Sequence, residues 1–238
     1  MRRVVRGFWG PRQESAEALA RRWKQTLDRL GGLLPEACAG TGGDGPWRNV
    51  PGSGPATALR PDEDSLLAAV RAAQAADGWS DRTGTSTQFV AAGAPGWKVE
   101  VSGRGGGTSE YLLQAVVIGI RSPEGAKVPD VALLTAVAEV WEADFGGVSD
   151  DDVLDALEDD GGFTPDEPSV GWAGYLSSAR AALLPDDLTA ARKQVGSQGV
   201  LLEIAGPGDA ETVLRANLRL REAGALQALP RPMDRAAL

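Results

Sequence analysis

Residues 4–30 read VVRGFWGPRQESAEALARRWKQTLDRL, and in this stretch a predicted strand is followed by a tight turn and an amphipathic helix. The apolar run from Val4 to Trp9 predicts the strand, and the Gly10-Pro11 pair predicts the turn. In the helix, apolar residues recur at three- and four-residue spacing, so one side of it faces a core. This opening therefore predicts a helix that packs against a strand.

Further elements follow from composition and periodicity. An Ala-rich helix is predicted for residues 66–76 because acidic residues precede it and favour a helix start. Apolar composition or alternation predicts strands, and apolar stripes predict helices. The predicted strands are 89–92, 97–101, 111–120 and 199–205, and the predicted helices are 131–141 and a last one capped by Asp209. The glycine-rich residues 103–107 are interpreted as the turn of a hairpin, because they lie between two predicted strands.

The order of these elements indicates one α+β domain, with an antiparallel or mixed sheet that is covered by helices. The chain has 238 residues, of which 42% are hydrophobic and 24% charged, as is typical of globular proteins. Residues 40–61 are rich in glycine and proline, which predicts a long loop that Trp47 fixes to the body. The last residues, 227–238, are expected to form a flexible tail.

The side-chain inventory argues against an enzyme. The sequence contains no histidine, which removes the commonest general base and the usual imidazole metal ligand. Cys38 is the only cysteine, so an internal disulfide and a cysteine-based metal site are excluded. We therefore expect no catalytic residues, no metal and no cofactor. Paired carboxylates can still perform acid–base chemistry, so a carboxylate-dependent hydrolase or metal-binding enzyme remains the alternative.

The formal net charge of −9 favours a basic protein partner. Nucleic acid and anionic membranes both require a basic surface, so neither is an expected partner. No apolar run approaches the length of a membrane span. The N-terminus MRRVVRGFWG has no uninterrupted apolar segment of the kind found in secretory signals, so we expect a cytoplasmic protein.

The negative charge is concentrated between Lys127 and Arg180, where thirteen acidic and no basic residues occur. Such a surface steers a basic partner toward it. The simpler interpretation is a solvated acidic helix that keeps the protein soluble. A calcium loop is disfavoured, because residues 150–160 lack the ligand order of an EF-hand. The predicted partner-binding residues are Glu142, Asp144, Asp150, Asp151, Asp152, Asp155, Glu158, Asp159 and Asp160.

Two motifs resemble the immunity protein 52 family of bacterial polymorphic toxin systems. The first is FWGPRQES at residues 8–15, followed by the amphipathic helix, and the second is VGWAGYLS at residues 170–177. The resemblance implies an immunity protein that binds and blocks a cognate toxin, a basic nuclease domain, by occlusion and without chemistry. An interaction scaffold unrelated to toxins is a further alternative.

The motif residues themselves are expected to maintain the fold. Glycine and proline fix a sharp strand-to-helix turn, and a tryptophan at such a turn can bury a large area. Use of the aromatic residues at an interface is the alternative, because aromatic residues and arginine are enriched at binding hot spots. The residues assigned to this structural role are Trp9, Gly10, Pro11, Arg12, Trp172 and Tyr175.

Overall fold

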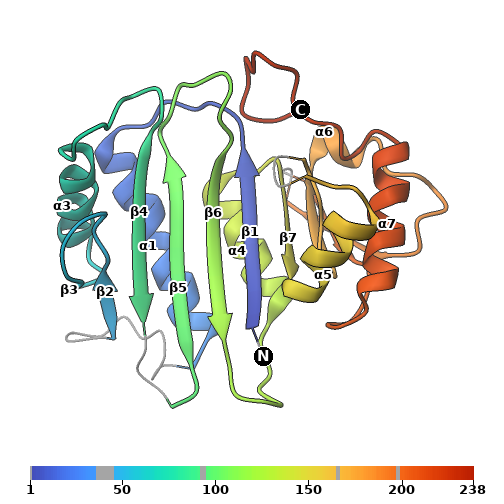
Figure 1. The fold of residues 1–238 in the computed structure, drawn as a ribbon, viewed down its shortest axis with the longest axis horizontal. Helices are drawn as coiled ribbons and strands as arrows, with labels where there is room; N and C mark the ends of the chain where they lie inside the picture. Colours follow the sequence, from blue (N-terminus) through green and yellow to red (C-terminus); the bar gives the residue numbers. More distant parts are fainter. Residues whose placement is uncertain (1, 36–45, 92–94, 165–166, 197–198) are drawn as a thin grey trace.

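A ten-stranded antiparallel sheet forms the centre of the computed structural model, which describes residues 2–35, 46–91, 95–164, 167–196 and 199–238 (Figure 1). The strands lie in the order β3-β2-β4-β5-β6-β1-β7-β8-β10-β9, and all neighbours are antiparallel. They are β1 (Arg2–Trp9), β2 (Trp47–Asn49), β3 (Thr57–Ala58), β4 (Thr85–Ala91), β5 (Lys98–Gly105), β6 (Gln114–Arg121), β7 (Phe145–Ser149), β8 (Ala173–Ser177), β9 (Ala191–Val195) and β10 (Gly199–Glu203). The predicted α+β class is confirmed.

Strand β1 occupies the middle of the sheet, between β6 and β7. Val5 lies opposite Ile118 on β6 and Val148 on β7, and all three side chains are buried. Because side chains alternate along a strand, Val5 and Trp9 point to one face of the sheet and Arg6 points to the other. The central strand therefore contributes apolar side chains to the core on one face and presents the charged Arg6 side chain on the other.

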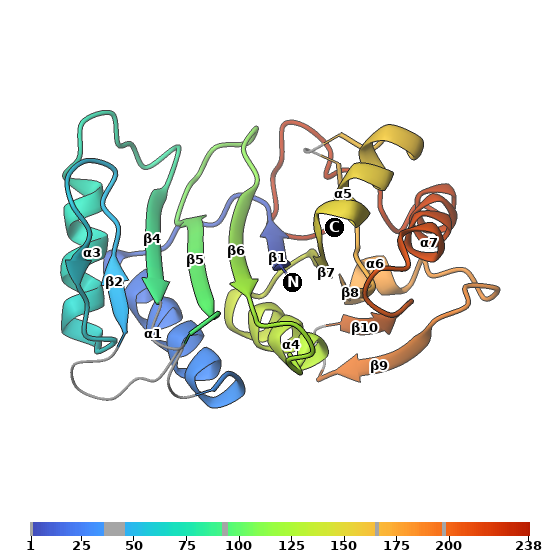
Figure 2. The ribbon, with the colours of Figure 1, turned by 60° about the horizontal axis from the view of Figure 1, so that its bottom comes forward.

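The helices cover the two faces of the sheet unequally (Figures 1 and 2). Helices α1 and α4 pack on one face, with α3 beside α1, whereas α5, the π-helical turn η1 and α7 lie on the other face near β7 to β10. They are α1 (Ala16–Leu33), α3 (Glu63–Gln74), α4 (Asp130–Trp141), α5 (Asp151–Asp155), η1 (Ala156–Asp160), α6 (Ser178–Ala181) and α7 (Ala210–Glu222).

One part of the sheet has no helix over it among the described residues. This surface, which we call the open sheet face, is formed by β4, β5 and β6 on the side opposite α1 and α4 (Figure 1). Its side chains include Ser86, Gln88, Ser102, Arg104 and Val117.

No helix in the described ranges is long and apolar enough to cross a membrane.

Polar side chains cap the helices where the sequence leads one to expect them. The Ser15 hydroxyl accepts a hydrogen bond from the Ala18 amide at the start of α1. The Asp62 and Asp209 carboxylates accept from backbone amides at the starts of α3 and α7. Each cap satisfies one of the amides that a helix leaves unpaired in its first turn. The predicted N-cap at Asp209 is confirmed.

A row of aromatic rings fills the space between the sheet and its two covering helices. Trp9 on β1 stacks on Trp141 of α4, with ring centroids 5.2 Å apart. Trp23 of α1 meets Trp141 edge to face at 4.7 Å and Phe89 of β4 at 5.3 Å. All four rings are buried. The row therefore joins two strands and two helices, and each contact adds to the free energy gained by burying the rings.

The glycine-rich stretch from Gly103 to Gly107 differs from its predicted role as a turn, because β5 continues to Gly105. A Cβ atom at Gly103 would lie 2.6 Å from the Ala115 carbonyl oxygen, and one at Gly105 would lie 2.9 Å from a methyl group of Leu19. These glycines thus allow α1 to approach the sheet closely. The predicted long loop at 40–61 is interrupted by β2 and β3; its residues up to 45, like Cys38, lie outside the described residues.

The C-terminal residues 227–238, predicted to form a flexible tail, contact the body at several points. Leu229 and Met233 are buried, and the Gly10 amide donates to the Ala236 carbonyl at 2.8 Å. A Cβ atom at Gly10 would lie only 2.2 Å from the Arg235 carbonyl oxygen. Gly10 is therefore required for the tail to lie across the end of β1.

Candidate functional site

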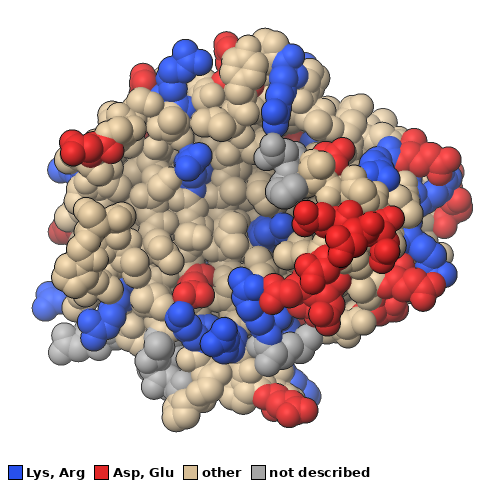
Figure 3. Space-filling view, in the orientation of Figure 1, with Lys and Arg blue, Asp and Glu red and all other residues tan. Residues whose placement is uncertain are grey.

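Exposed carboxylates cover α5 and η1 and form what we call the acidic surface. Figure 3 shows them as one group, beside the largely uncharged area over β4 to β6. Its members are Asp151, Asp152, Asp155, Glu158, Asp159 and Asp160, and all are exposed. Asp150, half-buried, precedes them as the N-cap of α5.

The local sequence explains why these carboxylates face water. The Asp150 side chain accepts a hydrogen bond from the Val153 amide at 3.0 Å, which starts α5. Val153 and Leu157, four residues apart, are buried, so the same side of both helical turns faces the core. At the C-terminal end of η1, the negative end of the helix dipole makes acidic residues unfavourable. There Arg221 of α7 donates a hydrogen bond to the Gly161 carbonyl at 3.0 Å. Val153 and Leu157 therefore anchor α5 and η1 in the core, and the carboxylates of this segment face solvent.

Most of this negative charge is not neutralised by the protein. Among the described residues, the one ion pair that involves α5 or η1 joins Arg2 to Asp151, and both side chains are about half exposed. The other five members of the acidic surface make no ion pair there. Clustered, unpaired charges of one sign produce a field that attracts a basic partner over long distances.

Glu142 and Asp144, both predicted to bind the partner, lie apart from the acidic surface; Glu142 is exposed and Asp144 is buried. Glu142 ends α4 in a left-handed conformation, with φ of 47°, and its carboxylate pairs with Arg12 and Arg22. The Arg22 guanidinium lowers the pKa of Glu142 through a hydrogen bond. Strand β7 places Asp144 and Asp150 at opposite ends, roughly 20 Å apart at about 3.3 Å per residue. Acidic residues that follow one another in the sequence therefore lie in two separate parts of the structure.

Asp144 is fully buried and serves as the centre of a polar network. Its carboxylate accepts from Arg180 Nε at 2.8 Å and from the Ser177 hydroxyl at 2.8 Å. The Leu238 amide donates to the same carboxylate at 3.1 Å. Arg180, also fully buried, donates to the Ala225 carbonyl at 2.9 Å. This network connects β7, β8 and α6 to the C-terminal residues and does not reach a partner.

Trp9 and Arg12, from the first family-like motif, lie in the core and at its edge. Trp9 is fully buried, and the Arg12 guanidinium lies 5.2 Å from the centre of its ring. Arg12 also pairs with Glu14 and Glu142. Burial lowers the pKa of Arg12, although these two carboxylates oppose the change. Pro11 is half-buried beside them.

Trp172 and Tyr175, from the second motif, are buried as well. The Trp172 indole donates to the Asp130 carboxylate at 3.0 Å, and Arg3 pairs with the same carboxylate at 3.2 Å. Burial raises the pKa of Asp130 despite the nearby arginine. Burial, followed by the charge of Asp144, raises the pKa of Tyr175 to about 12. The motif therefore places its aromatic rings in the core.

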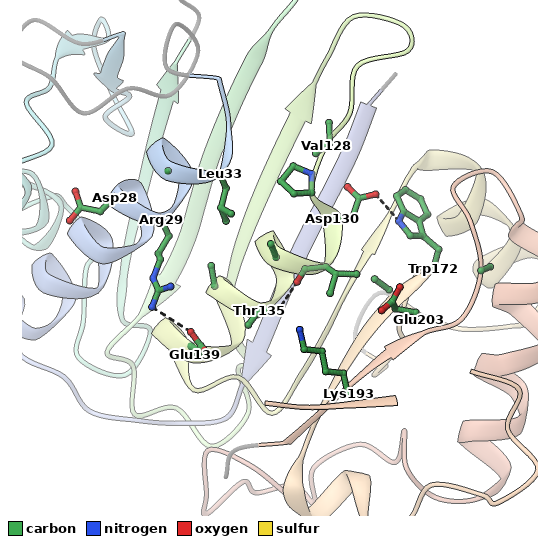
Figure 4. A pocket seen from close by; sticks show the side chains of 17 residues that line it. Asp28, Arg29, Leu33, Val128, Asp130, Thr135, Glu139, Trp172, Lys193 and Glu203 are labelled. Carbon is green, nitrogen blue, oxygen red and sulfur yellow. Dashed lines mark hydrogen bonds and ion pairs between the residues drawn. The ribbon is translucent and has the colours of Figure 1, made fainter. Parts of the chain in front are cut away.

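A groove of about 870 Å³ lies between α1, α4 and the strands β9 and β10 (Figure 4). Val131, Ala132 and Ala136 of α4 form apolar parts of its lining. Asp130 also lines the groove, and Arg29 pairs with Glu139 at 3.5 Å. Lys193 and Glu203 line it without an ion pair to any described residue. Sequence patterns did not reveal the groove, because its walls come from segments far apart in the chain.

Within the described ranges, no three carboxylate or cysteine side chains are grouped so as to hold a metal ion. The two buried arginines are instead paired with carboxylates, Arg180 with Asp144 and Arg3 with Asp130. Comparison with known proteins adds no assignment: no protein-family model and no curated protein matches this sequence.

Proposed function

We propose that this protein is a cytoplasmic immunity protein that binds a cognate polymorphic toxin and blocks it by occlusion. The observation that carries the proposal is the acidic surface, whose carboxylates are exposed and largely unpaired while the core beneath them is closely packed. A rigid segment that presents charge of one sign suits rapid capture of a basic protein.

The proposed toxin is a basic nuclease domain. The motifs at residues 8–15 and 170–177 resemble those of immunity protein 52, a family associated with toxins that have a restriction-endonuclease-like domain. A nuclease that binds nucleic acid carries basic side chains for the phosphates. The acidic surface resembles a phosphate backbone in the sign and density of its charge. It would therefore compete for the same basic side chains of the toxin.

The alternative of a carboxylate-dependent hydrolase has weaker support from the positions of the acids. Catalytic carboxylate pairs work in pockets that exclude water and separate their pKa values. Here the clustered carboxylates lie on an exposed surface, and the half-buried Asp130 and the buried Asp144 are each paired with an arginine. A scaffold unrelated to toxins shares the same surface, so the identity of the partner distinguishes it from an immunity protein.

Co-expression tests the proposal. The toxin domain encoded beside this gene should kill cells when expressed alone, and the full-length protein should restore growth and copurify with the domain. Gene position separates the alternatives further, since a scaffold or hydrolase has no reason to lie beside a toxin. Failure of the protein either to rescue growth or to copurify with a toxic neighbour would refute the immunity function.

The acidic surface should set the rate of association. Asp152→Asn, Asp155→Asn, Asp159→Asn and Asp160→Asn together remove four unpaired negative charges from this surface. Steering of this kind raises association rates by about 10- to 1,000-fold and is screened by salt over roughly 8–10 Å. We expect the variant to associate at least about 10-fold more slowly than the wild type at low salt in stopped-flow measurements. Its rate should also depend less steeply on salt.

A matched control removes the same amount of charge elsewhere. Asp64, Asp77, Asp81 and Glu124 are exposed and make no ion pair among the described residues, so their amide variants leave the acidic surface intact. This control variant should associate nearly as fast as the wild type and keep its salt dependence. Equal slowing in both variants would show that net charge acts without regard to position, and parallel salt curves for all three proteins would show that the acidic surface is only solvated.

A further inference from the structure

A small pocket lies where β1 and β7 meet α5 and η1, next to the acidic surface. Its volume is about 210 Å³, below the roughly 300–1,000 Å³ of small-molecule sites, so it suits one side chain. Three phenylalanines and three leucines form most of its wall, and two glutamates also line it. The residues that matter most are Arg6, Phe8, Phe145, Leu157, Glu158 and Phe163.

Arg6 gives this pocket an unusual charge. Its Nε atom is buried and makes no hydrogen bond, and the side chain forms no ion pair with any described residue. The guanidinium lies 5.7 Å from the centre of the Phe8 ring. Burial lowers the pKa of Arg6, and no opposing carboxylate raises it. Glu167, which lines the same pocket, accepts instead from the Thr164 amide.

Arg6 is half-buried, with its Nε atom shielded from solvent, and the two buried arginines show what it lacks. Arg180 binds Asp144 and two carbonyl oxygens, and Arg3 binds Asp130. A buried charge without a partner lowers stability, because the water lost from it is not replaced. Arg6 therefore costs the free protein some stability. An incoming oxygen acceptor would recover that free energy.

We propose that this pocket receives a carboxylate side chain of a protein partner, with Arg6 as its ligand. A guanidinium offers two parallel N–H donors that match the two oxygens of a carboxylate, and the apolar wall strengthens the pair by excluding water. The glutamates that line the pocket and the adjacent acidic surface weaken the binding of an isolated anion without preventing it, because solvent and salt screen their charge. The inserted aspartate or glutamate is therefore surrounded by basic residues on the partner's surface.

Taking the partner to be the toxin rests on the proposed function, but the chemistry of the pocket is testable without any partner. Propionate reproduces the end of a glutamate side chain, and propionamide is its uncharged counterpart. At constant ionic strength, propionate should shift the Arg6 Nε–H resonance of the full-length protein saturably at millimolar concentrations, whereas propionamide should not. The absence of a saturable propionate shift, or equal shifts by both probes, would overturn the inference.

Variants connect the pocket to the toxin. Arg6→Met fills a similar space without charge, and Arg104→Met changes an exposed arginine of the open sheet face as the control. Loss of one member of a buried charge pair should weaken toxin binding by about 30-fold or more for Arg6→Met. The control should change the affinity less than about threefold. Arg6→Lys, which keeps the charge but not the paired donors, should give an intermediate loss.

The stability of the free protein separates the outcomes. Because Arg6 lacks a partner, Arg6→Met should unfold in urea at the same or a higher midpoint than the wild type. A lower midpoint together with unchanged toxin affinity would assign Arg6 a structural role and overturn the inference. A propionate shift without any toxin binding by the wild type would refute the proposed function, while the carboxylate pocket would stand.

Discussion

Trp9→Ala should lower the free energy of unfolding by about 3–5 kcal/mol, a large part of the roughly 5–15 kcal/mol that stabilises a typical domain. Trp9 is fully buried and stacks on Trp141 at one end of the aromatic row. Its loss leaves a cavity between β1 and α4 and removes the ring that faces the Arg12 guanidinium. Urea unfolding followed by circular dichroism measures the change.

Trp79→Ala is the matched control, because it removes the same side chain from a surface position. Trp79 is 40% exposed, and its indole donates to the Thr85 hydroxyl at 3.3 Å. Loss of one such hydrogen bond costs about 1 kcal/mol, so this variant should remain close to the wild type. If Trp9→Ala unfolded like the wild type but no longer bound the toxin, Trp9 would belong to the interface and its structural assignment would be wrong.

The elements predicted correctly are those with strong local signals. Helix α1 has an apolar stripe and a capping serine, β6 is almost continuously apolar, and Asp209 marks the start of α7. Each of these signals depends on contacts within one element or its first turn, so it can be recognised from residues that are close together in the sequence. Such signals were sufficient for the fold class, because the order of strands and helices limits the possible architectures.

Strands β7 and β8 were missed, although they lie inside the sheet. Their sequences are rich in glycine, which is depleted in strands generally. The structure shows why glycine is needed: a Cβ atom at Gly146 would lie 2.3 Å from the Arg6 carbonyl oxygen, and one at Gly174 would lie 2.8 Å from Val170. This requirement arises from tertiary contacts, so composition alone did not indicate these strands.

The candidate site was predicted in part for the same reason. The exposure of the acids from Asp151 to Asp160 follows from helical spacing around Val153 and Leu157. The burial of Asp144 depends on Arg180, which lies 36 residues further along the chain, and no local pattern connects the two. The lack of an ion pair at Arg6 could not be predicted either, because the sequence around a single arginine in a strand does not indicate whether its side chain is paired.

Arg180→Met should lower the free energy of unfolding by about 3–5 kcal/mol, because it leaves the Asp144 carboxylate buried without its cation. The Ser177 hydroxyl and the Leu238 amide would remain as donors, but neither carries charge. The double variant Asp144→Asn with Arg180→Met should recover a good part of the loss, since no uncompensated charge then remains in the core. Urea unfolding of both variants and of the wild type measures the difference.

A comparison of Arg180→Met with Arg6→Met distinguishes a paired from an unpaired cation, since both variants remove a guanidinium from the same protein. The first leaves a carboxylate unpaired and should destabilise, whereas the second removes a cation that has no described partner and should not. If Arg180→Met unfolded within about 1 kcal/mol of the wild type, the interior around Asp144 would have to be hydrated. Asp144→Asn alone should also leave the association rate with the toxin unchanged, because the carboxylate has no exposed area from which to steer a partner.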